Sequence, residues 1–119
     1  MDAPLTTEAL LDAHLRRFAA GDLEGILSEY ADDAVLISAD GVLRGPAAIR
    51  PLFVAMFDEF SQPGVTFALQ ARRVEGDCAY IAWRAETPQR SYTLGADTFV
   101  VRDGRIVYQT SAIASTPKR

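Results

Sequence analysis

The sequence is almost without cysteine, histidine and lysine. Among its 119 residues, Cys78, His14 and Lys118 are the single members of their types, beside eleven arginines. A lone cysteine has no partner for an internal disulfide, and no CxxC pair or Cys/His cluster is present for structural zinc. These absences favour a reducing, cytoplasmic setting, and we expect no metal site.

Concentrated positive charge and long apolar runs are also missing. Twelve basic and sixteen acidic residues give a formal net charge of −4, and the basic residues form no run longer than the pairs Arg16-Arg17 and Arg72-Arg73. Nucleic-acid binding needs a concentrated basic face, so we expect no nucleic-acid partner. No apolar run approaches the ~18 residues of a spanning helix, and the start lacks the regions of a secretory signal, so we expect no membrane association.

What is present is typical of one globular domain. The chain is 49% hydrophobic and 24% charged, and a chain of this length can bury a core without cross-links. We predict a single domain over residues 1–119, with residues 115–119 as a disordered tail. A glycine-rich phosphate loop, a GxSxG elbow and an HExxH pair are all missing, so we expect no cofactor.

Apolar spacing predicts three helices in the first half of the chain. The first runs from about Thr6 to Ala20, with Gly21 as its left-handed stop. Asp22 can cap a second, short helix that closes at Tyr30. Gly45-Pro46 opens the third helix, in which Pro51 predicts a kink or an irregular first turn.

Alternating apolar segments and turn residues predict the strands. A first hairpin joins Ala34–Ser38 to Val42–Arg44 through Ala39-Asp40-Gly41. The second half contains four further strand-like segments with short connections: Val65–Val74, Cys78–Glu86, Ser91–Arg102 and Arg105–Ala114. Short connections are typical of an antiparallel meander. We therefore predict an α+β fold, a curved sheet with helices packed on one face.

Two polar residues interrupt otherwise apolar segments and are the first functional candidates. His14 lies on the buried face of the first helix, and Asp97 is the only charge in a long strand. Each has a plainer interpretation: a core histidine bonded to a neighbour, and a carboxylate on the solvent face or in a surface ion pair. Tyr30 and Trp83 are most simply packing aromatics.

The order of local motifs along the chain resembles a known family. The motifs are Ala20-Gly21-Asp22-Leu23-Glu24-Gly25-Ile26, Tyr30-Ala31-Asp32-Asp33-Ala34, Arg44-Gly45-Pro46-Ala47-Ala48-Ile49, Asp97-Thr98-Phe99 and Asp103-Gly104-Arg105-Ile106. Together they resemble the ketosteroid isomerase and SnoaL-like branch of the nuclear transport factor 2-like (NTF2-like) superfamily over nearly the whole chain. The resemblance implies a cone of three helices packed in a strongly curved, mostly antiparallel sheet. It says less about function, because this fold hosts several chemistries and non-enzymatic binders.

The resemblance also implies roles for particular residues. In ketosteroid isomerases, a tyrosine seven residues before the Gly-Asp corner and a protonated aspartic acid in the penultimate strand donate hydrogen bonds to the dienolate oxygen; here these positions hold His14 and Asp97. The supporting tyrosine is Tyr30. The aspartate base of the family falls on Ser38, which cannot move a proton. Two mechanisms stay open: an ionised Asp97 orients His14 as a general base, or a neutral Asp97 and His14 polarise a carbonyl while another group is the base.

We therefore expect a small, mainly apolar carbonyl compound in a cavity of the cone, and cofactor-free isomerase or lyase chemistry with His14, Asp97 and Tyr30 as catalytic residues. The alternative is a non-catalytic ligand-binding or dimerisation domain of the same fold. A homodimer through the outer sheet face is expected from the family and from apolar residues on both faces of Ser91–Arg102. The expected substrate-binding residues are Phe18, Ser38, Phe53, Phe57, Trp83, Phe99, Gln109, Ser111 and Ile113.

Overall fold

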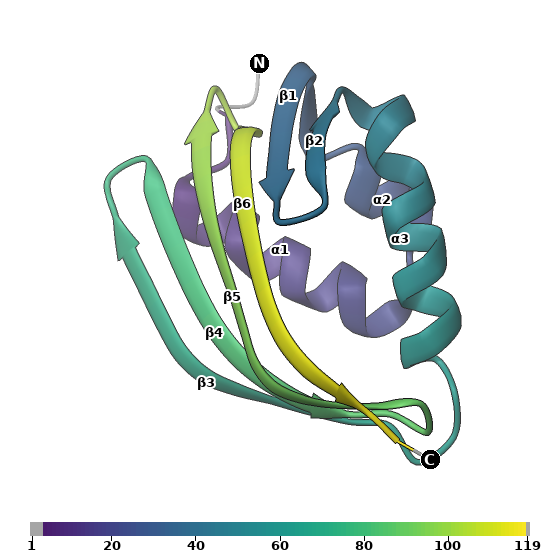
Figure 1. Ribbon diagram of the computed structural model, residues 1–119. Coiled ribbons are helices and arrows are strands. Elements are labelled where there is room, and N and C mark those ends of the chain that lie inside the picture. Colours follow the sequence, from purple (N-terminus) through teal and green to yellow (C-terminus); the bar gives the residue numbers. More distant parts are fainter. Residues whose placement is uncertain (1–3, 119) are drawn as a thin grey trace.

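Three helices and one six-stranded sheet make up the computed structural model, which describes residues 4–118 (Figure 1). The elements follow in the order α1 (Thr7–Ala20), α2 (Leu23–Leu27), β1 (Tyr30–Ser38), β2 (Gly41–Arg44), α3 (Pro46–Phe60), β3 (Thr66–Glu75), β4 (Cys78–Glu86), β5 (Arg90–Arg102) and β6 (Arg105–Pro117). This order confirms the predicted α+β fold, with helices first and a meander last. None of the helices in residues 4–118 has the length and apolar character needed to cross a membrane.

The corner between α1 and α2 is built from local capping, as the sequence predicts. The Thr6 hydroxyl accepts a hydrogen bond from the backbone N–H of Ala9 at 3.1 Å. Gly21 ends α1 in the left-handed region with φ 66°, and Asp22 accepts from the N–H of Gly25 at 3.0 Å to start α2. Each cap satisfies backbone groups that a helix end leaves free. The corner therefore fixes the direction in which the chain leaves α1.

Tyr30 and the chain end differ from their predicted states. Tyr30 begins β1 instead of closing the second helix, because the carbonyl of Glu29 already accepts from the Ile106 N–H at 2.8 Å. Strand β6 continues to Pro117, and the Lys118 N–H donates to Gln89 at 2.7 Å, so the predicted disorder from residue 115 is wrong up to Lys118. Residue 119 lies outside the described residues. In both places, pairing with a distant strand overrides the local pattern. Pro51 lies inside α3, which continues across it to Phe60.

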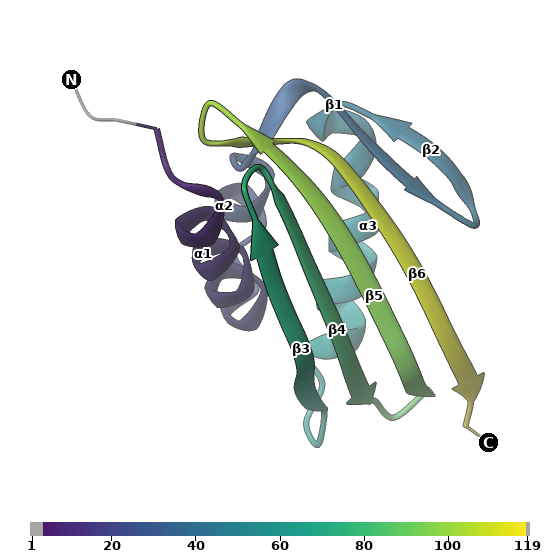
Figure 2. The ribbon, with the colours of Figure 1, turned by 90° about the vertical axis from the view of Figure 1, so that its left-hand side faces the viewer.

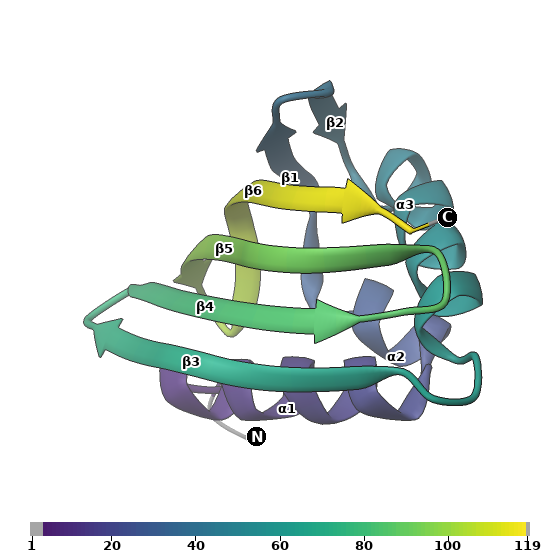
Figure 3. The same ribbon diagram turned by 60° about the horizontal axis from the view of Figure 1, so that its bottom comes forward.

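The sheet has the strand order β2-β1-β6-β5-β4-β3, in which only β1 and β6 are parallel. Register shifts occur at matching places in three neighbouring strands, between Leu69 and Ala71, Trp83 and Ala85, and Tyr92 and Leu94. Such irregularities bend strands and increase their twist. The long strands accordingly curve around the helices (Figures 1 and 3), and Figure 2 shows the outer face of the sheet with α3 behind it and α1 beside β3.

The core fills the concave side of this sheet. Its most deeply buried side chains come from all three helices and from the inward face of the strands: Leu10, Ile26, Tyr30, Leu36, Ile49, Phe53, Phe99 and Ile106. Burial of side chains of this size is the main stabilising contribution, at roughly 25 cal/mol per Å² of apolar surface. The same inward face continues beyond this core toward the C-terminal end of α3, where the site described below lies.

Gly95 provides a test of how the sheet is packed on its inner face. A Cβ atom at Gly95 would lie 2.0 Å from Cε2 of the buried Trp83 indole. Gly95→Ala therefore has to displace the indole, and we expect it to lower the free energy of unfolding by about 1–3 kcal/mol, measured by urea denaturation. In a Trp83→Leu background the added methyl has room, so the same change is expected to cost less. Equal costs in both backgrounds would contradict this packing.

Candidate functional site

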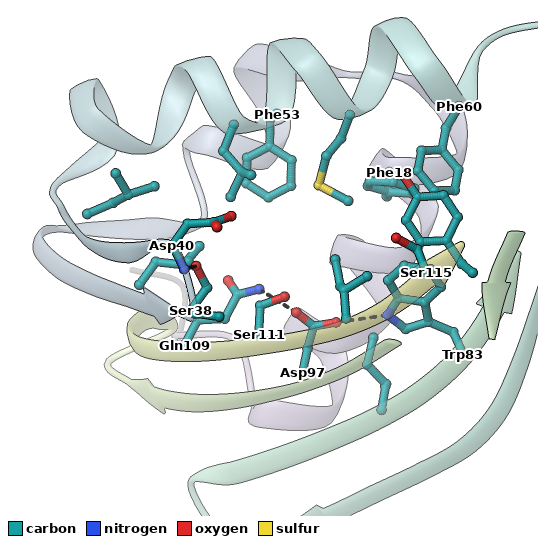
Figure 4. A pocket seen from close by; sticks show the side chains of 18 of the residues that line it. Phe18, Ser38, Asp40, Phe53, Phe60, Trp83, Asp97, Gln109, Ser111 and Ser115 are labelled. Atoms are coloured by element: carbon teal, nitrogen blue, oxygen red, sulfur yellow. Dashed lines mark hydrogen bonds between the residues drawn. The ribbon is translucent and has the colours of Figure 1, made fainter. Parts of the chain in front are cut away.

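A pocket of about 630 Å³ lies between α1, α3, the β1–β2 hairpin and the inner face of the sheet. This volume is in the range of small-molecule sites. One end is aromatic and includes Phe18, Phe60 and Trp83; the other end is polar and is lined by Ser38, Asp40, Gln109 and Ser111. Asp97 lies on the sheet side between the two ends, opposite Phe53 on α3 (Figure 4). A ligand in this pocket therefore meets a flat apolar surface and a set of polar atoms at opposite ends.

His14 reaches this pocket from the middle of α1. Its side chain is buried, and Nδ1 lies 2.6 Å from Oε1 of Glu29, at the junction between α2 and β1. Arg17, one turn further along α1, donates to Oε2 of the same carboxylate at 2.8 Å. Glu29 is 2% exposed, and a carboxylate this deeply buried needs such charge-assisted partners. We call these three residues, His14, Glu29 and Arg17, the Glu29 cluster. Its two contacts are the most buried ionic contacts among residues 4–118.

The Glu29 cluster determines which histidine nitrogen is available. A carboxylate that accepts from Arg17 also accepts a proton donor at its second oxygen, which places the hydrogen of the imidazole on Nδ1. Every buried polar side-chain atom of residues 4–118 has a hydrogen-bond partner. Nε2 has none within this part of the chain, so it is accessible, and His14 lines the pocket. His14 is thus a buried imidazole that Glu29 holds at one nitrogen, while the other has no partner among residues 4–118.

Asp97 belongs to a second, separate chain of hydrogen bonds. The Trp83 indole N–H donates to Oδ2 at 2.9 Å, and the Gln109 amide donates to Oδ1 at 3.2 Å. The Tyr30 hydroxyl donates to the amide oxygen of Gln109 from behind. All four side chains are buried. This chain, hereafter the Asp97 relay, connects β1, β6, β5 and β4 across the floor of the pocket. The partner of His14 is therefore Glu29, and Asp97 does not orient the imidazole.

Tyr30 is held in its neutral form. Burial raises the pKa of its phenol well above the ordinary value, and the nearby carboxylates of Glu29 and Asp97 raise it further. A neutral phenol donates one hydrogen, which Gln109 accepts through its amide oxygen. The amide nitrogen of Gln109 then faces Asp97 as a donor. The relay has one direction, from Tyr30 toward Asp97.

The structure brings most of the expected site residues together around the pocket. His14 and Asp97 line it, together with Phe18, Ser38, Phe53, Trp83, Gln109, Ser111 and Ile113. Tyr30, Phe57 and Phe99 were expected there and instead lie behind the lining. Tyr30 supports Gln109, Phe57 packs on the rings of Phe18 and Phe53, and Phe99 packs against the His14 ring with centroids 5.0 Å apart.

Sequence reasoning missed Glu29, Arg17 and two charged lining residues, Asp40 and Arg90. Glu29 stands near Asp32-Asp33, in a segment that looks like a solvated turn, so its burial has no local signature. The only available signal was His14 itself, because a buried histidine needs a partner. Residues 4–118 contain no group of three or more His, Cys, Asp or Glu side chains placed to hold a metal ion.

Tyr92 closes the aromatic end of the pocket. Its hydroxyl donates to Oε2 of Glu59 at 2.8 Å, and the Thr87 hydroxyl donates to the same oxygen at 2.7 Å. Burial, and next the hydrogen bond to Glu59, raise the pKa of Tyr92 to about 12. This contact connects the end of α3 to the β4–β5 turn. The closure of this end therefore depends on a protonated phenol.

The raised pKa of Tyr92 predicts a loss of stability at alkaline pH. The folded chain holds this proton more tightly than the unfolded chain, whose tyrosines titrate near 10.0, so the contribution is complete below pH 10.0 and is lost as the pH rises toward about 12. A phenolate absorbance titration should show this step, and Tyr92→Phe should remove it. Denaturation across the same pH range should show a shallower decline for Tyr92→Phe. An unchanged titration in that variant would contradict the assignment.

Several solved structures share this architecture. An NTF2-like protein of unknown function from Burkholderia xenovorans superposes with a TM-score of 0.75 at 19% identity, covering 95% of this chain and 86% of that one. A candidate ketosteroid isomerase from Kribbella flavida gives 0.74 at 15% identity, over 95% and 81% of the two chains. A candidate polyketide cyclase from Sinorhizobium meliloti gives 0.71 at 20% identity, over 86% and 92%. Similarity at these identities establishes the fold.

A search of curated protein sequences finds no significant match. The family comparison is more specific, because residues 11–109 match the SnoaL-like domain. That segment extends from the helix bearing His14 to Gln109 of the Asp97 relay, and so includes both hydrogen-bonded clusters. The chain therefore belongs to the SnoaL-like domain family of the NTF2-like fold.

Proposed function

We propose that the protein is a cofactor-independent enzyme that transfers a proton at a carbon next to a carbonyl group, on a small and mainly apolar molecule. The observation that carries this proposal is the 2.6 Å contact between His14 and Glu29, behind an imidazole that lines a pocket. A carboxylate that holds Nδ1–H fixes the ring and leaves Nε2 with a lone pair. This is the arrangement of a general base.

The proposed step begins when Nε2 of His14 takes the proton from the α-carbon. The C–H bond breaks, an N–H bond forms, and the electron pair moves through the α-carbon to the carbonyl oxygen, giving an enolate. Glu29 stabilises the imidazolium that results, while Arg17 keeps the charge of that carboxylate balanced. Where the substrate has a β,γ double bond, the enolate is a conjugated dienolate, and return of the proton to the γ-carbon completes an isomerisation. Where the β-carbon carries a leaving group, re-formation of the carbonyl expels that group with its bonding electrons and completes a lyase reaction instead.

The surroundings of His14 suit this chemistry. The pocket wall is largely aromatic and aliphatic near the imidazole, including Leu15, Phe18 and Phe53. Such a wall excludes water and strengthens electrostatic interactions within the site. The hydroxyls of Ser38 and Ser111 are donors available to the developing oxyanion at the polar end. Ser38 occupies the position of the usual family base, and His14 takes over the proton transfer that a serine cannot perform.

A substrate-independent probe tests this proposal. The ring of 5-nitrobenzisoxazole opens to a coloured phenolate when a base removes its carbon-bound proton, so it reports any general base in an apolar pocket. We expect saturable turnover by the protein, and His14→Gln should lower kcat by about a hundredfold or more, the scale of a general base. Glu29→Gln should lower it less, because the base remains but its orientation is lost. Asp33→Asn, an exposed acid on β1, is the matched control and should retain full turnover.

The single histidine gives a second measurement that needs no variant. Diethyl pyrocarbonate modifies imidazoles, and hydroxylamine removes the modification, so turnover should disappear and return with these treatments. Circular dichroism of each variant verifies that it folds. An absence of saturable turnover, or turnover unaffected by His14→Gln and by the reagent, would overturn the enzymatic function and favour a non-catalytic ligand-binding domain.

We also propose that the protein acts in the cytoplasm as a homodimer that pairs through the outer face of the sheet. Cys78 is exposed and has no disulfide partner, which suits a reducing compartment. The outer face carries a row of small residues in register, Ala71, Ala82, Ala96 and Ala112, across four strands. Beside it, Tyr80 and Tyr108 are exposed aromatics. A face of small and aromatic residues allows close approach of a second sheet.

Sedimentation tests the dimer. We expect the mass of two chains at micromolar concentration. Ala112→Arg places a long cation in the middle of the outer face, where Ala112 is exposed, and should give monomers with unchanged folding. Asp33→Arg, which introduces the same side chain elsewhere on the surface, should remain dimeric. A monomeric wild-type protein would contradict the proposed assembly.

A further inference from the structure

The Asp97 relay has a direction that determines what Asp97 can do for a ligand. Both of its oxygens already accept hydrogen bonds, from Trp83 at 2.9 Å and from Gln109 at 3.2 Å. An indole N–H can only donate, and Tyr30 behind Gln109 turns the amide nitrogen toward Asp97. Asp97 is thus surrounded by donors. A neutral carboxylic acid would need one oxygen to act as a donor, and no acceptor faces it within the relay.

A carboxylate has more acceptor capacity than these two bonds use. Each oxygen carries about two lone-pair sites, and the relay occupies one on each. Asp97 also lines the pocket, where Figure 4 shows it between the polar and the aromatic ends. The remaining acceptor capacity therefore faces space that a ligand can enter. A bound molecule that brings a hydrogen-bond donor to this point is favoured over one that brings only an acceptor.

We infer that Asp97 accepts a hydrogen bond from a hydroxyl group of the ligand, and that the substrate class is a hydroxylated, flat-ringed carbonyl compound. This inference rests on the proposed function only for the carbonyl group on which His14 acts. It reverses the role that the strand aspartate has in the resembling isomerases, where a protonated acid donates to the substrate oxygen. In this chain, the carboxylate of Asp97 accepts a hydrogen bond from the ligand instead.

The aromatic end supports the flat ring in this inference. Trp83 stacks on Phe67 with centroids 5.5 Å apart and an interplanar angle of 28°, and Phe60 lies edge-on to the indole. Flat rings pack against such surfaces with a gain beyond their buried area. Because Trp83 also donates to Asp97, a ring against the indole places its hydroxyl substituent close to the carboxylate.

A hydroxyl fits the site better than a cationic group. The walls around Asp97 are mostly apolar, and burying an ammonium there would cost more than burying a neutral hydroxyl. The other charged or titratable side chains that line the pocket are His14 on α1, Asp40 on the β1–β2 turn, and Arg90 and Tyr92 on β5. The positive charge of Arg90 also disfavours a cationic ligand in the pocket. Asp33 is exposed on β1 and is not part of the lining, so it is the control for general negative charge.

4-Nitrophenol tests the inference directly, because it ionises close to neutral pH and only its phenolate is yellow. At that pH, an acceptor site binds the neutral phenol, so adding protein should reduce the yellow absorbance. 4-Nitroanisole, which has the same ring without the donor, should bind about tenfold more weakly. Quenching of Trp83, the single tryptophan, measures both affinities. Asp97→Asn should remove the preference for the phenol, and Asp33→Asn, which changes an exposed acid outside the pocket lining, should retain it.

A rise in yellow absorbance on binding would show a donor site and overturn the inference. Equal affinities for the phenol and the anisole, no binding of either, or loss of the preference in Asp33→Asn would also overturn it. The two wild-type measurements decide the question even where Asp97→Asn fails to fold. The benzisoxazole probe has no hydroxyl, so the two proposals can fail separately. His14-dependent turnover without a preference for the phenol would contradict only this inference. A preference for the phenol without turnover would contradict only the proposed function.

Discussion

The buried carboxylate of Glu29 is the contact on which the geometry of the site depends. An unpaired charge at this depth would be strongly destabilising, so Glu29 requires both His14 and Arg17 on α1. Its backbone carbonyl meanwhile accepts from Ile106 on β6 at 2.8 Å. One residue thus holds α1 against the sheet through its side chain and begins the pairing of β1 with β6 through its backbone. The position of the His14 ring follows from this double attachment.

Local patterns predicted the features that local chemistry controls. Thr6, Gly21 and Asp22 cap the helices as their residue types indicate, and the Asp103-Gly104 pair turns the last hairpin with both φ angles positive. Tyr30 and Glu29 could not be placed in the same way, because their partners lie far along the chain. The hydroxyl of Tyr30 meets Gln109, 79 residues later, and Glu29 meets residues 12 and 15 positions earlier. Their states depend on the assembled fold.

Alternation predicted which side of the sheet the site residues face, but not how far the pocket extends. Asp97 and Phe99 both point inward on β5, yet only Asp97 lines the pocket, because the His14 ring covers Phe99. On α3, the apolar stripe is broader than the pocket, and Phe57 packs sideways on Phe18. A pocket ends where another side chain fills the space. That boundary is a property of packing among α1, α3 and the sheet, which no single segment encodes.

Three departures from the isomerase pattern fit together chemically. The base position holds Ser38, the position of the donating tyrosine holds His14, and the strand aspartate is surrounded by donors from Trp83 and Gln109. Under the proposed mechanism, the last two positions each act as an acceptor: Nε2 of His14 takes a proton, and the oxygens of Asp97 accept a hydrogen bond. Restoring a donating tyrosine at position 14 would leave the site without a base, because Ser38 cannot take the proton. A histidine that takes the proton and an aspartate that receives a hydroxyl are therefore consistent with each other and with a serine at the former base position.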